Sequence, residues 1–429
     1  GASSGMAMAH WEIQGWMILI LGWVFVPFYT RSMVYTMPEF LERRYNPQSR
    51  TILSVISLVS YVLTKVAVTV YAGGLVFQQV FGIKELWGID FFWIAAIGLV
   101  VLTALYTIFG GMKSVLYTSV LQTPILLLGS LIILVLGFKE LGGWDEMMRV
   151  CGAVTVNDYG DTMTNLIRSN DDANFPWLGA LIGSAIIGFW YWCTDQFIVQ
   201  RVLSGKNEME ARRGTIFGAY LKLLPVFLFL IPGMIAFALH QKYIGAGGEG
   251  FLPMLANGTA NADAAFPTLV AKLLPAGVKG LVVCGILAAL MSSLASLFNS
   301  SAMLFTIDFY KRFRPETPEK KLVGIGQVAT VVIVILGILW IPIMRSVGDV
   351  LYTYLQDVQS VLAPGIAAAF LLGICWKRTS AQGGMWGLIA GMVIGLTRLG
   401  AKVYYSNAGE VADSTFKYLF YDMNWLFFC

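Results

Sequence analysis

Residues 188–201 read GFWYWCTDQFIVQR and directly follow an apolar run at 175–187 that is typical of a membrane helix. Packed aromatic residues are followed by an ionisable Asp195 and, two turns later, by Arg201. A carboxylate at the end of a span is tolerated where it reaches headgroups, water or a charged partner. The aromatic side chains can close over a ligand, or they can belong to the aromatic belt of a membrane interface. The remainder of the chain has to distinguish these interpretations.

The composition is that of a membrane protein. Of the 429 residues, 57% are hydrophobic and 13% are charged, which is about half the charged fraction of a soluble protein. The apolar residues form runs of roughly 20, the length that crosses a bilayer. We therefore predict an all-α polytopic membrane protein. The net charge of +4, without a basic tract interleaved with aromatic residues, predicts no nucleic-acid partner.

About ten full spans fit the apolar runs, and a further one begins near Phe416. Their approximate ranges are 5–29, 51–82, 91–109, 115–138, 175–197, 214–240, 276–305, 322–345, 350–374 and 383–404. Pro38, in the first turn of MPEFLERRY, predicts a short amphipathic helix on the membrane surface. The loops are too short to hold a separate domain, so residues 1–429 are predicted to form a single transmembrane domain.

Basic residues are concentrated in alternate loops, and this asymmetry predicts the orientation. The basic loops lie at 31–50, 113, 201–213, 311–321 and 377–378. By the positive-inside rule these loops face the cytoplasm, and the acidic segment 139–174 faces outward. The span at 175–197 then runs inward, so Tyr191 and Trp192 lie toward its cytoplasmic half. Asp195 and Arg201, beyond them, are expected to tie helices together.

Polar residues interrupt three of the spans. Glu12 is either an interfacial carboxylate or a ligand for a sugar or a cation. Lys222 either extends to the membrane surface or donates hydrogen bonds to a hydroxylated ligand. Gln356 and Asp357 belong either to a loop that enters a short helix or to a site for a polar ligand.

A fourth span contains the hydroxyl-rich segment 288–301, AALMSSLASLFNSS. Small residues often mark close helix packing. A hard monovalent cation, however, is bound by several neutral oxygens. The carbonyl of Ala289 and the hydroxyls of Ser292 and Ser293 lie on one helical face, at i, i+3 and i+4. This pattern favours a cation-coupled carrier for an uncharged polar solute.

These segments resemble the sodium/glucose cotransporter branch of the solute:sodium symporter family along nearly the whole chain. The matching segments include GASSGMAMA, LGWVFVPFY, VYTMPEFLERRY, WYWCTDQFIVQRVLSGKN, YLKLLP, MSSLASLFNSSAMLFTIDFYKRF and PGIAAAFLLGICWKR. The resemblance implies a LeuT-type core of two five-helix inverted repeats. The first core helix and the C-terminal helices of that core are expected to lie outside these 429 residues, in a longer chain.

The resemblance also implies roles for individual residues. Glu12, Lys222 and Gln356 match sugar-binding residues, and Tyr191 matches an inner gate beneath the sugar, with Trp192 beside it. Their implied chemistry is hydrogen bonding to sugar hydroxyls.

The resemblance places a sodium site on Ala289, Ser292 and Ser293. Two positions depart from the family pattern. Gly188 stands where the family has Thr or Asn, which is expected to remove one sugar contact. Ser119 stands where the family has a carboxylate implicated in a second sodium site, which favours one Na⁺ per sugar.

The leading hypothesis is a secondary transporter of the plasma membrane that couples Na⁺ influx to uptake of glucose or galactose by alternating access. Its implied partners are a small sugar and the lipid bilayer, and no protein partner is implied. A Na⁺/myo-inositol carrier is an alternative, because RSMVYTMPEF also resembles inositol carriers. A sugar sensor that conducts sodium without transporting sugar is another. No phosphate-binding loop, HExxH motif or nucleophile elbow is present, so an enzyme is not expected.

Overall fold

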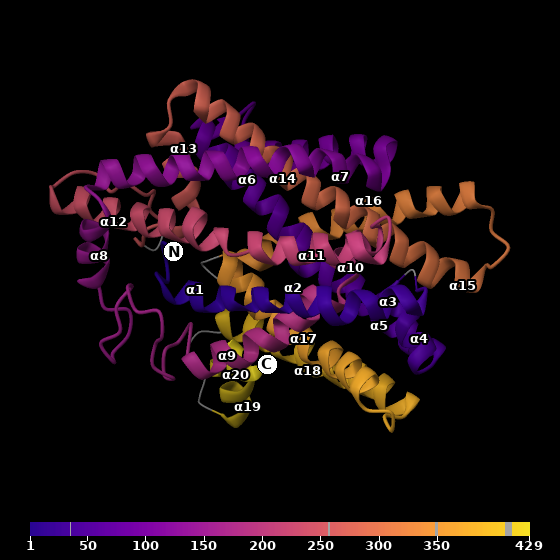
Figure 1. The fold of residues 1–429 in the computed structure, drawn as a ribbon. Coiled ribbons are helices and arrows are strands. Elements are labelled where there is room, and N and C mark those ends of the chain that lie inside the picture. The colour runs from indigo at the N-terminus through magenta and orange to yellow at the C-terminus, as the bar shows by residue number, and fades with distance from the viewer. Residues whose placement is uncertain (35, 256–257, 348–350, 408–413) are drawn as a thin grey trace. The chain divides into compact units, whose positions relative to one another are not determined.

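The computed structural model describes residues 1–429 except 35, 256–257, 348–350 and 408–413 (Figure 1). The described chain is mainly helical, as predicted, with one two-stranded antiparallel hairpin. Elements labelled η are 3₁₀ or π turns, and most of them continue directly into α-helices. The elements are α1 (Ala7–Trp11), η1 (Glu12–Gly15), α2 (Trp16–Ile20), η2 (Leu21–Phe25), α3 (Val26–Ser32), α4 (Met37–Arg44), α5 (Pro47–Ser60), η3 (Tyr61–Val66), α6 (Ala67–Phe81), β1 (Glu85–Leu86), β2 (Ile89–Asp90), α7 (Phe91–Leu141), α8 (Trp144–Gly152), α9 (Trp177–Gly188), η4 (Phe189–Thr194), α10 (Gln196–Leu203), α11 (Glu208–Leu221), η5 (Val226–Leu230), α12 (Ile231–Gly245), η6 (Ala262–Ala264), α13 (Ala265–Leu273), α14 (Ala276–Met303), η7 (Leu304–Tyr310), α15 (Lys311–Phe313), α16 (Glu319–Val347), α17 (Leu351–Cys375), α18 (Ala381–Asn407), α19 (Thr415–Lys417), η8 (Tyr418–Asp422) and α20 (Trp425–Phe428).

Among the described residues, eight helices are long and apolar enough to cross a membrane. The number is nine if a bent pair of helices is counted as one span. The eight are Pro47–Phe81, Ser119–Leu141, Trp177–Thr194, Glu208–Gly245, Ala276–Phe313, Glu319–Ile343, Tyr354–Cys375 and Ala381–Ser406. The prediction of a multi-pass membrane protein is confirmed. The short helix predicted from Pro38 is also present, as α4 (Met37–Arg44).

The structure differs from the predicted spans in the region of α7. Spans at 91–109 and 115–138 were predicted with a loop around Lys113, but α7 is one continuous helix of 51 residues. The intervening segment contains no proline to interrupt the backbone hydrogen bonds of a helix. A helix of this length extends over roughly 75 Å, well beyond the hydrocarbon core of a bilayer.

The chain divides into two compact units that alternate along the sequence. Unit 1 consists of Gly1–Glu12, Thr69–Leu178 and Leu223–Ala295, and unit 2 of Ile13–Val68, Gly179–Lys222 and Ser296–Cys429. The single transmembrane domain expected over 1–429 remains a prediction.

The core of unit 1 forms where α12 packs against α7, α8 and α13. Small residues also let α7 and α14 approach closely. A Cβ built on Gly129 of α7 would lie 2.5 Å from Cγ2 of Val282, and one built on Gly285 would lie 2.9 Å from Cγ2 of Ile125. This close packing fixes the α14 helix, which carries the predicted sodium ligands.

Unit 2 contains the closely packed pair α17 and α18. A Cβ on Gly391 would lie 2.7 Å from Cα of Gly365, so the two backbones touch where both residues are glycine. A Cβ on Gly395 would collide with the carbonyl oxygen of Val361. This pair holds Gln356 and its neighbours in place.

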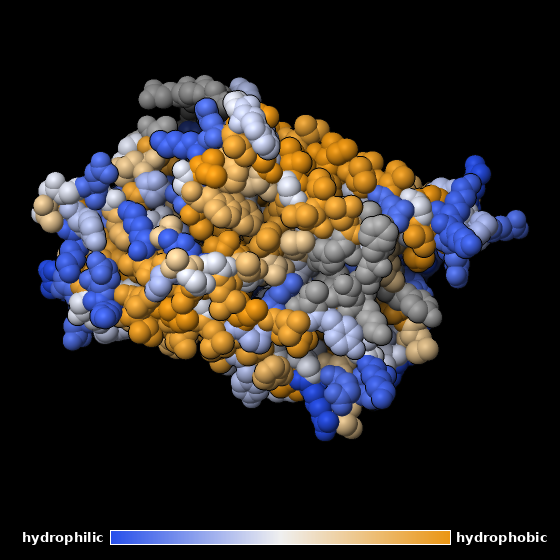
Figure 2. Space-filling view, turned by 90° about the horizontal axis from the view of Figure 1, so that it is seen from above, coloured by the Kyte–Doolittle hydropathy of each residue, from blue (hydrophilic) through white to orange (hydrophobic). Residues whose placement is uncertain are grey.

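Hydrophobic side chains cover much of the surface visible in Figure 2, and hydrophilic ones gather toward the edges of that view. About two-thirds of each side chain is exposed for Val120 (69%) and Leu121 (72%) of α7 and for Leu339 (65%) of α16. Many large apolar side chains are exposed in this way, which indicates an outer surface that faces lipid.

The contact between α17 and α18 generates a test. Gly391→Ala is expected to lower the unfolding free energy by about 1–3 kcal/mol, because the new methyl group meets backbone atoms that cannot turn aside. Gly387→Ala in the same helix is the matched control, since its Cβ would meet nothing within 4 Å. Thermal unfolding of the purified full-length protein in detergent measures both. Equal midpoints for the two variants would contradict the close contact.

Candidate functional site

The stretch at 188–201 is not a uniform helix. The α9 helix (Trp177–Gly188) passes into the π-turns of η4 (Phe189–Thr194), and the backbone becomes extended at Asp195 before α10 begins at Gln196. The Asp195 side chain caps α10 by accepting from the N–H of Phe197. The hydroxyl of Tyr29 donates to the carbonyl oxygen of Cys193 at 2.8 Å, which satisfies a backbone acceptor released by the break. π-Turns inside helices are frequent at functional sites.

A buried ion pair holds this break in unit 2. The ammonium of Lys65, in η3 (Tyr61–Val66), donates to Oδ2 of Asp195. The hydroxyl of Tyr61 donates to Oδ1 of the same carboxylate at 2.8 Å. Both charged side chains are buried, so neither can rely on water for solvation. The expectation that Asp195 ties helices together is confirmed, and its partner is Lys65.

The same ammonium lies against aromatic rings. Nζ of Lys65 is 4.2 Å from the ring centroid of Phe197, 4.8 Å from that of Tyr61 and 4.9 Å from that of Tyr191. The Tyr191 ring in turn makes an edge-to-face contact with Trp192, with centroids 4.9 Å apart. The predicted gate residues are therefore held by a cation–π contact and an aromatic pair, both of which favour one ring orientation.

Several buried side-chain atoms of unit 2 have no hydrogen-bond partner among the described residues, and two of them belong to predicted solute-binding residues. These two are Nε1 of Trp192, a donor, and Oε1 of Gln356, an acceptor. Their elements, η4 and α17, pack against each other. Buried polar groups are almost always paired, so unpaired ones mark a place where a ligand or water completes the bonding.

The neighbour of Gln356, Asp357, is held between two basic side chains. Asp357 accepts from Nζ of Lys402 at 2.7 Å, and its carboxylate is 3.6 Å from the guanidinium of Arg398. Arg398 is completely buried and also donates to the carbonyl oxygen of Met423 at 2.6 Å. This cluster joins α17, α18 and the C-terminal segment, so Asp357 is used for structure.

The space beside Gly188 is filled. A Cβ on Gly188 would lie 3.0 Å from Cβ of Gln14 and 3.1 Å from Cγ of Met17. The sequence predicts a missing solute contact at this position. In the structure, side chains of η1 and α2 occupy the space, and a larger residue would have to displace them.

Lys222 lies at a break in its span and not within a regular helix. It is the C-cap of α11 (Glu208–Leu221), and only Leu223 separates it from the helical segment that resumes at Leu224. A Cβ built on Gly15 would lie 3.1 Å from Cγ of Lys222. The absence of a side chain at Gly15 therefore makes room for the aliphatic part of the lysine.

The predicted sodium ligands lie in α14 of unit 1. Ser292 is buried, and its hydroxyl oxygen is 2.6 Å from that of Ser119 in α7. Ser293 is exposed and Ala289 is half-buried. The structure thus brings Ser292 together with Ser119, the position at which the resemblance predicts a carboxylate in the family. Among the described residues, no group of three or more His, Cys, Asp or Glu side chains could hold a metal ion.

The predicted solute-binding residues are divided between the units. Tyr191, Trp192, Lys222 and Gln356 belong to unit 2, and Glu12, the first residue of η1, belongs to unit 1. Lys65 was not predicted from the sequence as a functional residue. A single lysine inside the long apolar run 51–82 was the signal that could have found it, because a charge within a span needs a partner.

Comparison with known proteins identifies the family, because the family model "Sodium:solute symporter family" matches residues 1–391. The chain belongs to the sodium:solute symporter family. Over 412 residues it is 37% identical to sodium/myo-inositol cotransporter 2 of Homo sapiens and 39% identical to sodium/glucose cotransporter 4 of Homo sapiens. Each alignment covers 93% of this chain and 60% of the relative. The chain thus spans about 60% of the length of these relatives.

A solved structure supports the fold of this family member. It is the substrate-bound outward-open state of a Na⁺-coupled sialic acid symporter, with a TM-score of 0.66 and 19% sequence identity. The match covers 93% of this chain and 84% of the other. The predicted all-α multi-pass fold class is confirmed, and the family model confirms the predicted family.

The Lys65–Asp195 pair generates a second test. Lys65→Met or Asp195→Asn alone is expected to lower the unfolding free energy by about 3–5 kcal/mol, because each leaves one buried charge without a partner. The double variant is expected to recover much of that loss, since no charge remains. Thermal unfolding of the full-length protein gives the three values.

Arg149→Met is the control, because the Arg149–Glu146 pair lies on an exposed helix surface and is expected to contribute nothing measurable. If the losses of the two single variants simply added up in the double variant, the ion pair would not be the interaction that holds the break.

Proposed function

We propose that the full-length protein is a Na⁺-coupled symporter of the plasma membrane for an uncharged hexose, glucose or galactose. The observation that supports this most strongly is that two of the predicted solute-binding residues carry buried neutral atoms without a partner among the described residues, Nε1 of Trp192 and Oε1 of Gln356. A sugar hydroxyl both donates and accepts, so it can satisfy an indole donor and an amide acceptor without introducing a charge.

In this proposal Tyr191 lies beneath the ring of the solute, with Trp192 and Gln356 bonded to its hydroxyls. Lys222 provides a charged donor for a further hydroxyl, and charge-assisted hydrogen bonds are the stronger kind. Glu12 of unit 1 stays a prediction from the sequence as a solute ligand. The half-buried Tyr191 and Trp192 rings offer flat apolar faces that suit the C–H surface of a sugar ring.

The proposed cation site uses neutral oxygens of unit 1. The carbonyl of Ala289 and the hydroxyls of Ser292 and Ser293 are its ligands. The 2.6 Å contact between Ser119 and Ser292 adds a hydroxyl where a carboxylate would add a charge. One Na⁺ per solute is therefore the proposed stoichiometry.

The proposed coupling requires that Na⁺ binds one conformation of the carrier better than the other. Sodium then raises the population of the state that binds solute, and the solute raises the population of the state in which the gate closes. Lys65 and Asp195 keep the hinge at Asp195 in one geometry while Tyr191 and Trp192 change their contacts with the solute.

myo-Inositol is the second candidate substrate. It carries ring hydroxyls without a charge, as a hexose does, and the relatives at 37–39% identity are named for both kinds of solute. The unpaired atoms of Trp192 and Gln356 do not discriminate between them.

Uptake into proteoliposomes that contain the full-length protein tests the proposal. Labelled glucose, galactose or myo-inositol is expected to accumulate only under an inward Na⁺ gradient, with the unlabelled sugars as competitors. Accumulation that is unaltered when K⁺ replaces Na⁺ would refute coupling. Solute-evoked Na⁺ current without solute accumulation would identify a sensor instead.

Site variants test the residue roles. Gln356→Ala is expected to raise the solute concentration for half-maximal uptake about ten-fold and to leave the Na⁺ requirement unchanged, because it removes an acceptor for a hydroxyl. Gln359→Ala, one turn away in α17, is the control. Ser292→Ala is expected to raise the Na⁺ concentration required. Equal effects of Gln356→Ala and Gln359→Ala would show that the amide acts only in packing.

A further inference from the structure

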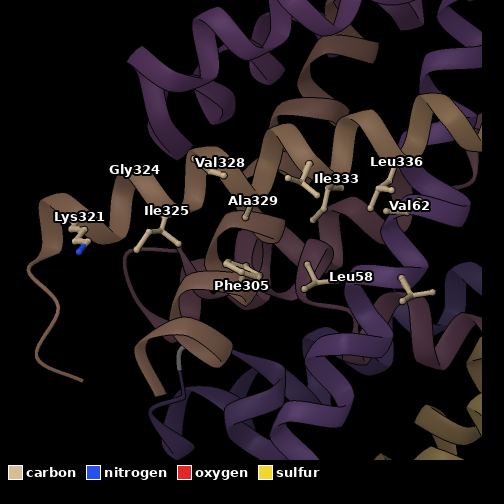
Figure 3. A pocket seen from close by; sticks show the side chains of 12 residues that line it. Leu58, Val62, Phe305, Lys321, Gly324, Ile325, Val328, Ala329, Ile333 and Leu336 are labelled. Atoms are coloured by element: carbon tan, nitrogen blue, oxygen red, sulfur yellow. The ribbon is translucent and has the colours of Figure 1, made fainter. Parts of the chain in front are cut away.

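Unit 2 contains a groove of about 710 Å³ that lies outside the proposed transport site. Leu58 and Val62 form one wall, from the helix Pro47–Phe81, and the α16 helix forms the other (Figure 3). Phe305 of η7 lies between them. The groove therefore runs along helices that are long and apolar enough to cross the membrane.

The lining is apolar except at one end. The α16 helix contributes Val328, Ile333 and Leu336, and Figure 3 shows Lys321 at the end of the row, where α16 begins. Val328 is 65% exposed and Leu336 is 48% exposed, so the groove opens to the surroundings of unit 2. A concave apolar surface at membrane depth is filled by hydrocarbon, because water there would have no polar partner.

The length of the groove matches one leaflet. From Lys321 to Leu336 the α16 helix rises about 22 Å, which is about half of a bilayer thickness of about 40–45 Å with its headgroup layers included. An acyl chain that begins at the headgroup level beside Lys321 would therefore reach the far end near the middle of the bilayer.

The positive charge of Lys321 at the polar end of the groove favours an anionic headgroup. Within the described part of the chain, the ammonium of Lys321 has no ion-pair partner. It belongs to the loop 311–321, which carries five basic and two acidic residues and is predicted to face the cytoplasm. The cytoplasmic leaflet is the one that carries anionic phospholipids.

We propose that this groove is a binding site for an anionic phospholipid, with one acyl chain against α16 and α5 and the phosphate at Lys321. Gly324 makes room for the chain near the headgroup, since a Cβ there would meet nothing within 4 Å. A neutral phospholipid offers the same hydrocarbon but a weaker contact with the ammonium, so the site discriminates by headgroup charge.

Photolabelling tests the site. The full-length protein is placed in nanodiscs with phosphatidylserine that carries a diazirine on one acyl chain, or with phosphatidylcholine of the same chain. Labelled peptides are expected from 324–336 and 58–62, and more strongly with phosphatidylserine. Lys321→Gln is expected to lower the phosphatidylserine labelling about five-fold, the effect of one basic residue near an anionic headgroup.

Two further variants separate the parts of the proposal. Gly324→Leu places a side chain in the groove where a Cβ meets nothing within 4 Å, and it is expected to lower labelling by both lipids. Lys320→Gln is the matched control, because Lys320 is exposed in the same helical turn and does not line the groove. Equal labelling by the two lipids, or equal effects of Lys320→Gln and Lys321→Gln, would overturn recognition of the headgroup at Lys321. Absence of label from the groove peptides would show that a different occupant, such as another segment of the full-length chain, covers it.

Discussion

The ion pair between Lys65 and Asp195 is the interaction on which the geometry of unit 2 depends. A charge in a membrane-spanning helix must find an opposite charge, because hydrocarbon cannot solvate it. Here the carboxylate at the break between η4 and α10 meets the ammonium of η3, and that pairing neutralises the charge at the break. The ring of Tyr191 lies over the same ammonium, so the pair also orients the aromatic residue next to the break.

Because of this constraint, charged and neutral polar side chains have different roles in unit 2. The charged side chains that lie deepest in unit 2 are neutralised by one another, as Lys65 is by Asp195 and Asp357 by Lys402. The buried atoms of Trp192 and Gln356 that remain unpaired in the described chain are neutral. A site of this kind suits a polar solute without charge. In unit 1 the contact of Ser119 with Ser292 likewise brings together neutral oxygens, which suit a small monovalent cation.

The sequence allowed some of this to be predicted and not the rest. The short helix α4 and the long apolar helices follow from hydrophobic run length and from Pro38, both local properties. The pairing of Lys65 with Asp195 joins residues 130 positions apart, and no local pattern encodes it. The continuity of α7 through Lys113 was missed because basic residues were taken to mark loops. The filled space at Gly188 depends on the packing of Gln14 and Met17, which periodicity does not reveal.

The central claim is that binding of Na⁺ and of an uncharged polyhydroxylated solute are coupled in the full-length protein. Calorimetric titration of glucose and of myo-inositol in Na⁺ and in K⁺ measures this coupling most directly. The account predicts that Na⁺ lowers the Kd of the transported solute roughly ten-fold and that saturating solute lowers the Kd of Na⁺ by the same factor, as linkage requires. Equal Kd values in Na⁺ and K⁺ for every solute would contradict it.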